Sequence, residues 1–296
     1  MDRTNWSRGE TEYNYLSVGI LVEGVFIPIV ATDLGEKGNS GTEGRLELID
    51  RFLLLWGHTK KELPVFYVTG DREFVGSEWL TELEKRALKF VVRIRCNMKF
   101  YPWLHGGMGI EKTGVVTLQR YLRLYGMRAT EVVLDSGFIV RFVAVDNDNM
   151  EERKSDPFVF LLTNLDGDPG EAAEIYRKRY RIESFFRHMK SNGFNLEQLN
   201  LKGTHKTNLM FAILGLIYTM ATLEGLWGSK TKPLKNKKFR NGVFQSKSTF
   251  LFGLARLKDR IEKIWDFFRC LIQTVKDPKL CKIDICLLYT SPSPRD

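Results

Sequence analysis

One continuous apolar run narrows the folds open to this chain more than any other segment. The run is VFYVTG, residues 65–70, bounded by Pro64 and Gly70. A strand without polar alternation is typical of a sheet that is covered on both faces, because neither face then meets water. The run therefore predicts an α/β protein with helices on both sides of a sheet. Asp71 follows at its carboxyl end, where ligands gather in open α/β sheets.

The neighbouring segments supply the remaining layers of this predicted fold. Two apolar strands, 12–21 and 24–34, flank a turn at Glu23 and Gly24. A helix over 42–57, a second helix over 77–89 and a further strand, FVVRIRC, follow in order. With the first strand reduced to Met1 and Asp2, this order predicts an RNase H-like mixed sheet flanked by helices.

Between Cys96 and Gly170 the chain is rich in β-branched and alternating runs. The runs are VVTLQRYL, EVVLDSGFIVRFVAVD and PFVFLLTN, and they predict a β-rich insertion before the next helix. Trp103 lies in this insertion. It is a candidate for stacking on an extruded base, with ordinary aromatic packing as the alternative.

The next helix carries a polar row at regular spacing. Tyr176, Arg179, Glu183 and Lys190 stand at offsets 0, 3, 7 and 14 in YRKRYRIESFFRHMK. On an α-helix these offsets fall within an arc of roughly 60°, beside an apolar stripe that would face the core. A carboxylate between two cations at such a rim suits a metal ion and a phosphate. The alternative is the solvated face of an ordinary amphipathic helix.

Three segments together resemble a known family. Residues 176–190 are similar to the motif Tyr, two residues, Arg, three residues, Glu, six residues, Lys (YREK) of bacterial insertion-sequence transposases, a branch of the DDE superfamily. LPVFYVTGDREFVGSEWL, residues 63–80, resembles the family segment that holds the second catalytic aspartate, and MDRTNW resembles the segment that holds the first. The resemblance spans nearly all of residues 1–269.

The resemblance implies a chemistry and a role for each motif residue. Asp2, Asp71 and Glu183 would be catalytic and would bind two Mg²⁺ or Mn²⁺ ions, for which carboxylate oxygens are suitable hard ligands. Tyr176, Arg179 and Lys190 would bind DNA phosphate. The expected reaction is metal-dependent phosphodiester cleavage and strand transfer at insertion-sequence ends.

Other assignments stay open at two positions. Asp71 could instead be the N-cap of a helix starting at residue 72. Asp33 and Asp50 compete with Asp2 as first ligand, although Asp33 ends a hairpin, Asp50 lies within a helix, and neither sits in a segment similar to the family. Two other functions also remain: a different RNase H-like nuclease, such as one that cuts RNA in hybrids, and a DNA-binding transposase remnant without catalysis.

Charge supports a polyanionic partner. The net charge is +9, with 21 Lys/Arg against 25 Asp/Glu in residues 1–170 and 23 against 10 in residues 171–285. The expected partners are transposon-end and target DNA, with a second copy of the chain in the DNA complex and no membrane.

The apolar segment 209–223 predicts a buried helix. The four cysteines lack disulfide or zinc spacing, which favours a reducing cytoplasm. The resemblance implies a bacterial cytoplasm, near the nucleoid.

The domain prediction divides the core into two parts. Residues 1–97 and 171–228 form the RNase H-like core, 98–170 the insertion and 229–285 a basic C-terminal region. The last segment, 286–296, resembles a translated sequencing adapter and is excluded as an artefact. Because Met1 directly precedes Asp2, the chain is expected to be an N-terminally truncated fragment.

Overall fold

The computed structural model describes residues 1–8, 11–35, 38, 40–59, 67–102, 116–126, 128–134, 136–147, 152–154, 156–199, 203–234, 236–239, 242–245 and 248–276. Trp103 and segment 286–296 lie outside these described residues. The chain divides into two compact units, Met1–Leu216 and Ile217–Asp296.

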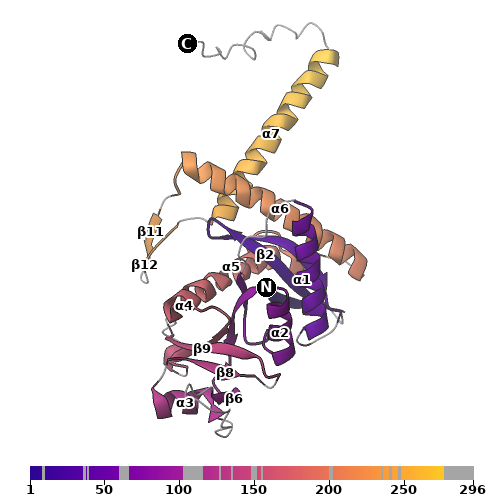
Figure 1. The fold of residues 1–296 in the computed structure, drawn as a ribbon. Coiled ribbons are helices and arrows are strands. Elements are labelled where there is room, and N and C mark those ends of the chain that lie inside the picture. Colours follow the sequence, from indigo (N-terminus) through magenta and orange to yellow (C-terminus); the bar gives the residue numbers. More distant parts are fainter. Residues whose placement is uncertain are drawn as a thin grey trace, which may run out of the picture. The chain divides into compact units, whose positions relative to one another are not determined.

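The first unit begins with three antiparallel strands (Figure 1). They are β1 (Asp2–Arg8), β2 (Thr11–Val22) and β3 (Val25–Asp33). Glu23 and Gly24 form the turn between β2 and β3, with positive φ angles of 48° and 76°. Two consecutive positive φ angles are what a two-residue type I′ turn requires. The predicted hairpin is therefore confirmed to within one residue at each strand end.

The first strand differs from its prediction, which limited it to Met1 and Asp2. β1 has seven residues and pairs with β2 from Asp2 opposite Ser17 to Arg8 opposite Thr11. Its sequence, DRTNWSR, is too polar to indicate a strand without its neighbour, and cross-strand pairing is what stabilises it. The prediction was wrong in this respect, and Asp2 begins a fully paired strand.

The second sheet of this unit has seven strands, in the order β4-β5-β10-β9-β8-β6-β7. The strands are β4 (Tyr67–Gly70), β5 (Lys89–Ile94), β6 (Lys99–Pro102), β7 (Val116–Thr117), β8 (Ala129–Val133), β9 (Ile139–Asp146) and β10 (Phe158–Thr163). β4 and β5 are parallel and the other pairs are antiparallel, so the sheet is mixed. Strands β6 to β10 are the predicted β-rich insertion, and they extend the sheet from the edge of β5.

Helices flank both sheets. They are α1 (Thr42–Gly57), α2 (Ser77–Lys85), α3 (Leu118–Tyr125), α4 (Pro169–Arg177), α5 (Arg181–Lys190) and α6 (Thr204–Thr231), with short 3₁₀ turns η1 (Glu152–Lys154), η2 (Lys178–Tyr180) and η3 (Leu196–Gln198). The predicted helix over 42–57 is confirmed by α1. The predicted helix 77–89 ends earlier, at Lys85, because Ala87 adopts a φ of 55° and redirects the chain into β5.

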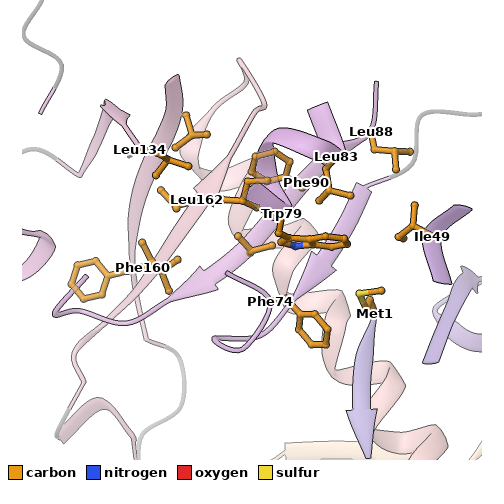
Figure 2. Packing of buried hydrophobic residues seen from close by; sticks show 14 of the residues in the cluster. Met1, Ile49, Phe74, Trp79, Leu83, Leu88, Phe90, Leu134, Phe160 and Leu162 are labelled. Atoms are coloured by element: carbon orange, nitrogen blue, oxygen red, sulfur yellow. The ribbon is translucent and has the colours of Figure 1, made fainter. Parts of the chain in front are cut away.

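Side chains alternate along β5, and buried hydrophobic residues lie on both faces of the sheet there. Phe90 and Val92 pack with Trp79 and Leu83 of α2, as Figure 2 shows for three of these residues. Val91 points the other way and joins a cluster with residues of α4. Successive strand residues face opposite sides, so the apolar middle of β5 is covered on both. The prediction of two covered faces for the strand at 65–70 was wrong for its described part, because β4 is at the edge of the sheet and Tyr67 is 40% exposed. The predicted RNase H-like α/β fold is confirmed.

The segment from Tyr176 to Lys190 is not the single helix that its spacing predicted. The 3₁₀ turn η2 separates α4 from α5, and Arg179 lies within that turn. The two helix types differ by only about half a residue per turn, so residue spacing does not distinguish them over so short a stretch. The break changes the direction of side chains after Arg177 relative to an ideal α-helix.

The second unit contains the later part of α6 with β11 (Asn236–Phe239), β12 (Gly242–Gln245) and α7 (Thr249–Lys276). By length and composition, α6 is the one helix of the described residues that meets the criteria for a bilayer span, with a mean hydropathy of 1.7 over its most apolar window, 39% of which is buried. Buried side chains occur along α6, including Phe211, Tyr218 and Ala221.

Candidate catalytic site

The three predicted carboxylates lie at the ends of three different elements. Asp2 is the first residue of β1, Asp71 follows β4 directly, and Glu183 lies in the first turn of α5. All three lie in the first unit.

Asp2 is held on both carboxylate oxygens. Oδ2 accepts a hydrogen bond from Arg179 Nη1 at 2.9 Å, and Oδ1 accepts one from the backbone N–H of Arg3 at 2.8 Å. Burial raises the pKa of the Asp2 carboxyl, while Arg179 and the Arg3 N–H act in the opposite direction. Since Arg179 and Asp2 side chains are only 12% and 14% exposed, solvent screens their ion pair little.

Met1 fixes the start of β1 next to β4. Its terminal amine donates to the carbonyl oxygen of Thr69 at 3.1 Å, and burial lowers the pKa of this amine to about 6. This contact connects the strand that carries Asp2 with the strand that precedes Asp71. The two aspartates, which come from different sheets, are close enough to interact electrostatically.

Arg179 is the cation that the carboxylates share. Its Nη2 donates to Glu183 Oε1 while Nη1 binds Asp2, and its guanidinium lies 5.6 Å from the centre of the Tyr176 ring. Burial acts to lower the Arg179 pKa, but Tyr176 and the surrounding carboxylates outweigh it and raise the pKa above its usual range. The position between the acidic groups is thus one where a positive charge is strongly favoured.

Tyr176 extends this arrangement to Asp71. Its hydroxyl donates to Asp71 Oδ1 at 3.4 Å, and burial raises the pKa of the hydroxyl. The N-cap alternative for Asp71 is wrong, because the next helix begins at Ser77 and its cap residue is Gly76. Asp71 is therefore available to the site.

Lys190 lies apart from the other three motif residues. Its Nζ donates to the Asn5 carbonyl, pairs with Glu197 at 3.4 Å and stands 5.9 Å from the Trp6 ring centre. Seven residues separate Lys190 from Glu183, which is about 10 Å along a helix at 1.5 Å per residue. The spacing therefore puts Lys190 beside β1, away from the carboxylates.

The two competing aspartates have other partners. Asp33 Oδ1 accepts from the backbone N–H of Gly35 at 3.1 Å, as a residue in a chain reversal does. Asp50 forms a two-pronged ion pair with Arg86, at 2.7 Å and 3.0 Å. Neither contacts Arg179 or Tyr176 in any hydrogen bond of the described residues.

The chemistry of the donors fits a divalent cation. Carboxylate oxygens are the ligands that Mg²⁺ and Mn²⁺ prefer, and Asp2 and Glu183 already share a positive charge. However, no three His, Cys, Asp or Glu side chains within the described parts of the chain lie close enough together to hold a metal ion. The Arg179 guanidinium lies between them instead.

Two charged neighbours of the site were not among the predicted site residues. Arg3 and Glu73 form an ion pair at 3.0 Å between the strand that begins with Asp2 and the turn that follows Asp71. Their positions beside the two aspartates in the sequence were the available signal. Nothing in local spacing indicates that they meet, because they are 70 residues apart.

One comparison with known proteins identifies a relative of this chain. A family model described as "Transposase DDE domain" matches residues 3–220, which is most of the chain. The match contains Asp71, Tyr176, Arg179, Glu183 and Lys190 and begins one residue after Asp2. The comparison with curated proteins gave no match.

Proposed function

The chain belongs to the transposase DDE domain family, and on this basis we propose that it is a metal-dependent DNA transposase of the YREK branch of bacterial insertion sequences. Its reaction would be phosphodiester cleavage and strand transfer at the ends of the element. The observation that carries this proposal is the convergence of Asp2 and Glu183 on Arg179, and of Asp71 on Tyr176.

In this proposal Asp2, Asp71 and Glu183 are the catalytic carboxylates and the metal ligands. When bound, two Mg²⁺ or Mn²⁺ ions would supply the positive charge that in-line displacement at phosphorus needs on the attacking and leaving oxygens. The protein's part is to favour the charged form of Asp2 and to hold Asp2 and Glu183 on one arginine. The ion pair of Asp2 with Arg179 supports this, because it favours the charged form of the Asp2 carboxyl and so acts against burial, which raises its pKa.

Tyr176, Arg179 and Lys190 are proposed to bind DNA phosphate beside the carboxylates. Arg179 Nε is buried and makes no hydrogen bond to a described residue, so the guanidinium is not fully satisfied in its present position. An arginine fork suits a phosphate as well as a carboxylate. When cations and DNA are bound, Arg179 could therefore release Asp2 and Glu183 and bind a DNA phosphate instead.

The remaining parts of the chain have proposed roles in the same reaction. Residues 1–97 and 171–228 would form the catalytic core, 98–170 the insertion and 229–285 a basic region for the DNA backbone. The protein would act as a homodimer on transposon ends and target DNA in the bacterial cytoplasm. The excess of Lys and Arg after residue 170 supports a DNA partner.

The proposal is tested by DNA nicking with the chain as it stands. In Mg²⁺, the protein is expected to convert supercoiled plasmid DNA to the nicked form, because hydrolysis of a DNA strand is the first step of transposition. Asp71→Asn and Glu183→Gln remove one charge each without changing shape. Each should abolish nicking and leave DNA binding, measured without metal, within about twofold of the unsubstituted protein, since binding relies on cations.

Asp50→Asn is the matched control, because it removes a carboxylate charge from the same unit, away from the site. It should nick normally. Normal nicking by Asp71→Asn would refute the assignment, and cleavage of RNA–DNA hybrids in preference to plasmid would favour the other RNase H-like nuclease. If the unsubstituted protein binds DNA but does not nick it in Mg²⁺ or in Mn²⁺, the non-catalytic remnant is favoured.

A further inference from the structure

We propose that Arg3 and Glu73 form a positioning pair that sets the separation of Asp2 and Asp71. This inference rests on the proposed function. It assigns neither residue to the chemistry itself, because both act through the aspartates that precede them in the chain.

The pair joins the two segments that carry the aspartates. Arg3 follows Asp2, and Glu73 is two residues after Asp71. Arg3 Nε donates to Glu73 Oε2 at 3.1 Å and to Oε1 at 3.3 Å, and Nη2 lies 3.0 Å from Oε2. A fork that engages both oxygens restricts orientation as well as distance. Because both Glu73 oxygens are occupied, Glu73 is placed to orient the turn.

Each partner is anchored by a second contact. Arg3 Nη1 donates to Asn14 Oδ1 of β2 at 3.1 Å. Arg45 Nη2 donates to the Glu73 carbonyl at 2.7 Å, and Arg45 Nε donates to Ser40 Oγ at 2.8 Å. Arg45 is only 5% exposed, so these bonds are shielded from water. The side chain and the backbone of Glu73 are thus held from opposite directions.

The turn between Asp71 and Glu73 transmits any displacement. Its backbone closes with a hydrogen bond from Phe74 N–H to the Asp71 carbonyl at 2.8 Å. Phe74 is fully buried and so close to Gly70 that a Cβ there would lie 2.6 Å from the Phe74 Cβ. Because these contacts make the turn rigid, the position of the Glu73 side chain, which Arg3 holds, is coupled to the position of Asp71.

The expected effect is large for residues that do not touch the reacting atoms. A displacement of about 1 Å can cost on the order of 10²-fold in rate, and loss of an outer partner of a metal ligand typically costs about 10–100-fold in metal affinity or activity. Arg3→Gln and Glu73→Gln should therefore lower the nicking rate roughly 10- to 100-fold. Both should also weaken Mn²⁺ binding to the protein without DNA, measured by isothermal titration calorimetry, and raise the Mg²⁺ concentration for half-maximal nicking.

The experiment uses the whole chain on supercoiled plasmid DNA over a Mg²⁺ titration. Glu73→Gln preserves shape, and circular dichroism at the assay temperature gives the folded fraction by which each rate is divided. Asp50→Asn is the matched control, because Asp50 and Arg86 form a similar two-pronged pair, at 2.7 Å and 3.0 Å, between α1 and the end of α2. A merely structural loss would not change the Mg²⁺ dependence of the folded protein.

The proposal is supported if Arg3→Gln and Glu73→Gln both shift the Mg²⁺ dependence while Asp50→Asn does not. It is overturned if Glu73→Gln keeps the rate and the Mg²⁺ dependence of the unsubstituted protein, or if Asp50→Asn shifts them equally. Asp71→Asn separates the two proposals. If it nicks normally, the proposed function fails; if it is inactive and Glu73→Gln is normal, only the positioning role fails.

Discussion

At the scale of single residues, the position of Arg179 determines how the acidic groups are compensated. Its guanidinium binds Asp2 and Glu183 and lies over Tyr176. Removing one partner of a buried ion pair leaves the other charge uncompensated, which is more costly than removing an exposed charge. Arg179 therefore links the charge state of Asp2 to any anion or cation that enters the site.

The salt dependence of DNA binding tests the phosphate role of Arg179 and Lys190. If each neutralises one phosphate, changing either to Ala should reduce the slope of log affinity against log salt by about one unit. Fluorescence anisotropy with labelled duplex DNA over a series of salt concentrations measures this slope.

Lys178 and Arg181 are the controls, because both are exposed neighbours of the motif residues. Their Ala variants should change the slope much less. Equal changes for all four variants would mean that this segment is a general basic surface, and the phosphate assignment would be withdrawn.

At the scale of elements, a group of aromatic rings holds α5 against the first sheet. Phe185, two residues after Glu183, lies 5.5 Å from Phe26 of β3 and meets Phe211 of α6 edge to face at 6.2 Å. Tyr15 of β2 stacks on Phe211 at 4.3 Å. Offset and edge contacts of this kind add to the burial of the rings themselves. They fix the helix that presents Glu183.

Phe185→Ala should therefore destabilise the protein by about 3–5 kcal/mol, as is typical when a fully buried Phe is removed. Urea unfolding followed by far-ultraviolet circular dichroism measures the change. Leu209→Ala is the control, because Leu209 is 57% exposed and its loss should cost little. Equal losses for the two variants would show that the aromatic group does not hold α5.

At the scale of the whole molecule, the chain divides into two compact units. In the second unit, α6 and α7 approach so closely that a Cβ on Gly253 would lie 1.7 Å from the Ala221 carbonyl oxygen. A Cβ on Gly225 would lie 2.1 Å from the Thr249 carbonyl oxygen. Glu224 pairs with Arg256 and Arg260 next to this contact. Glycine is thus required for the backbones to meet.

Gly253→Ala should lower the free energy of local opening of α7 by about 1–3 kcal/mol, the usual cost of overpacking. Hydrogen–deuterium exchange should show faster exchange in α7 and no change in β5 or β10, which belong to the first unit. Gly215→Ala is the control, because a Cβ at Gly215 meets nothing within 4 Å and should stabilise α6 by about 0.5–1 kcal/mol. Faster exchange in β5 and β10 as well as in α7 would contradict this expectation of a local effect.

The sequence alone was sufficient for features that depend on near neighbours. The turn at Glu23 and Gly24, the helix over 42–57 and the strand that leads to Asp71 all follow from local periodicity and from backbone preferences. The order of these elements also predicted the fold class. Such signals act between residues a few positions apart, so they can be read along the chain.

Only the tertiary structure determined which charges meet. Arg179 and Asp2 are 177 residues apart, and Arg3 and Glu73 are 70 apart. The strand β1 is likewise defined by its pairing with β2, because its polar sequence carries no strand signal. A charged side chain can pair with many partners of opposite sign, and folding selects one by bringing distant segments together and excluding water between them. For that physical reason, the sequence indicated the candidate residues of the site, and the packing of β1, β4 and α5 decided their contacts.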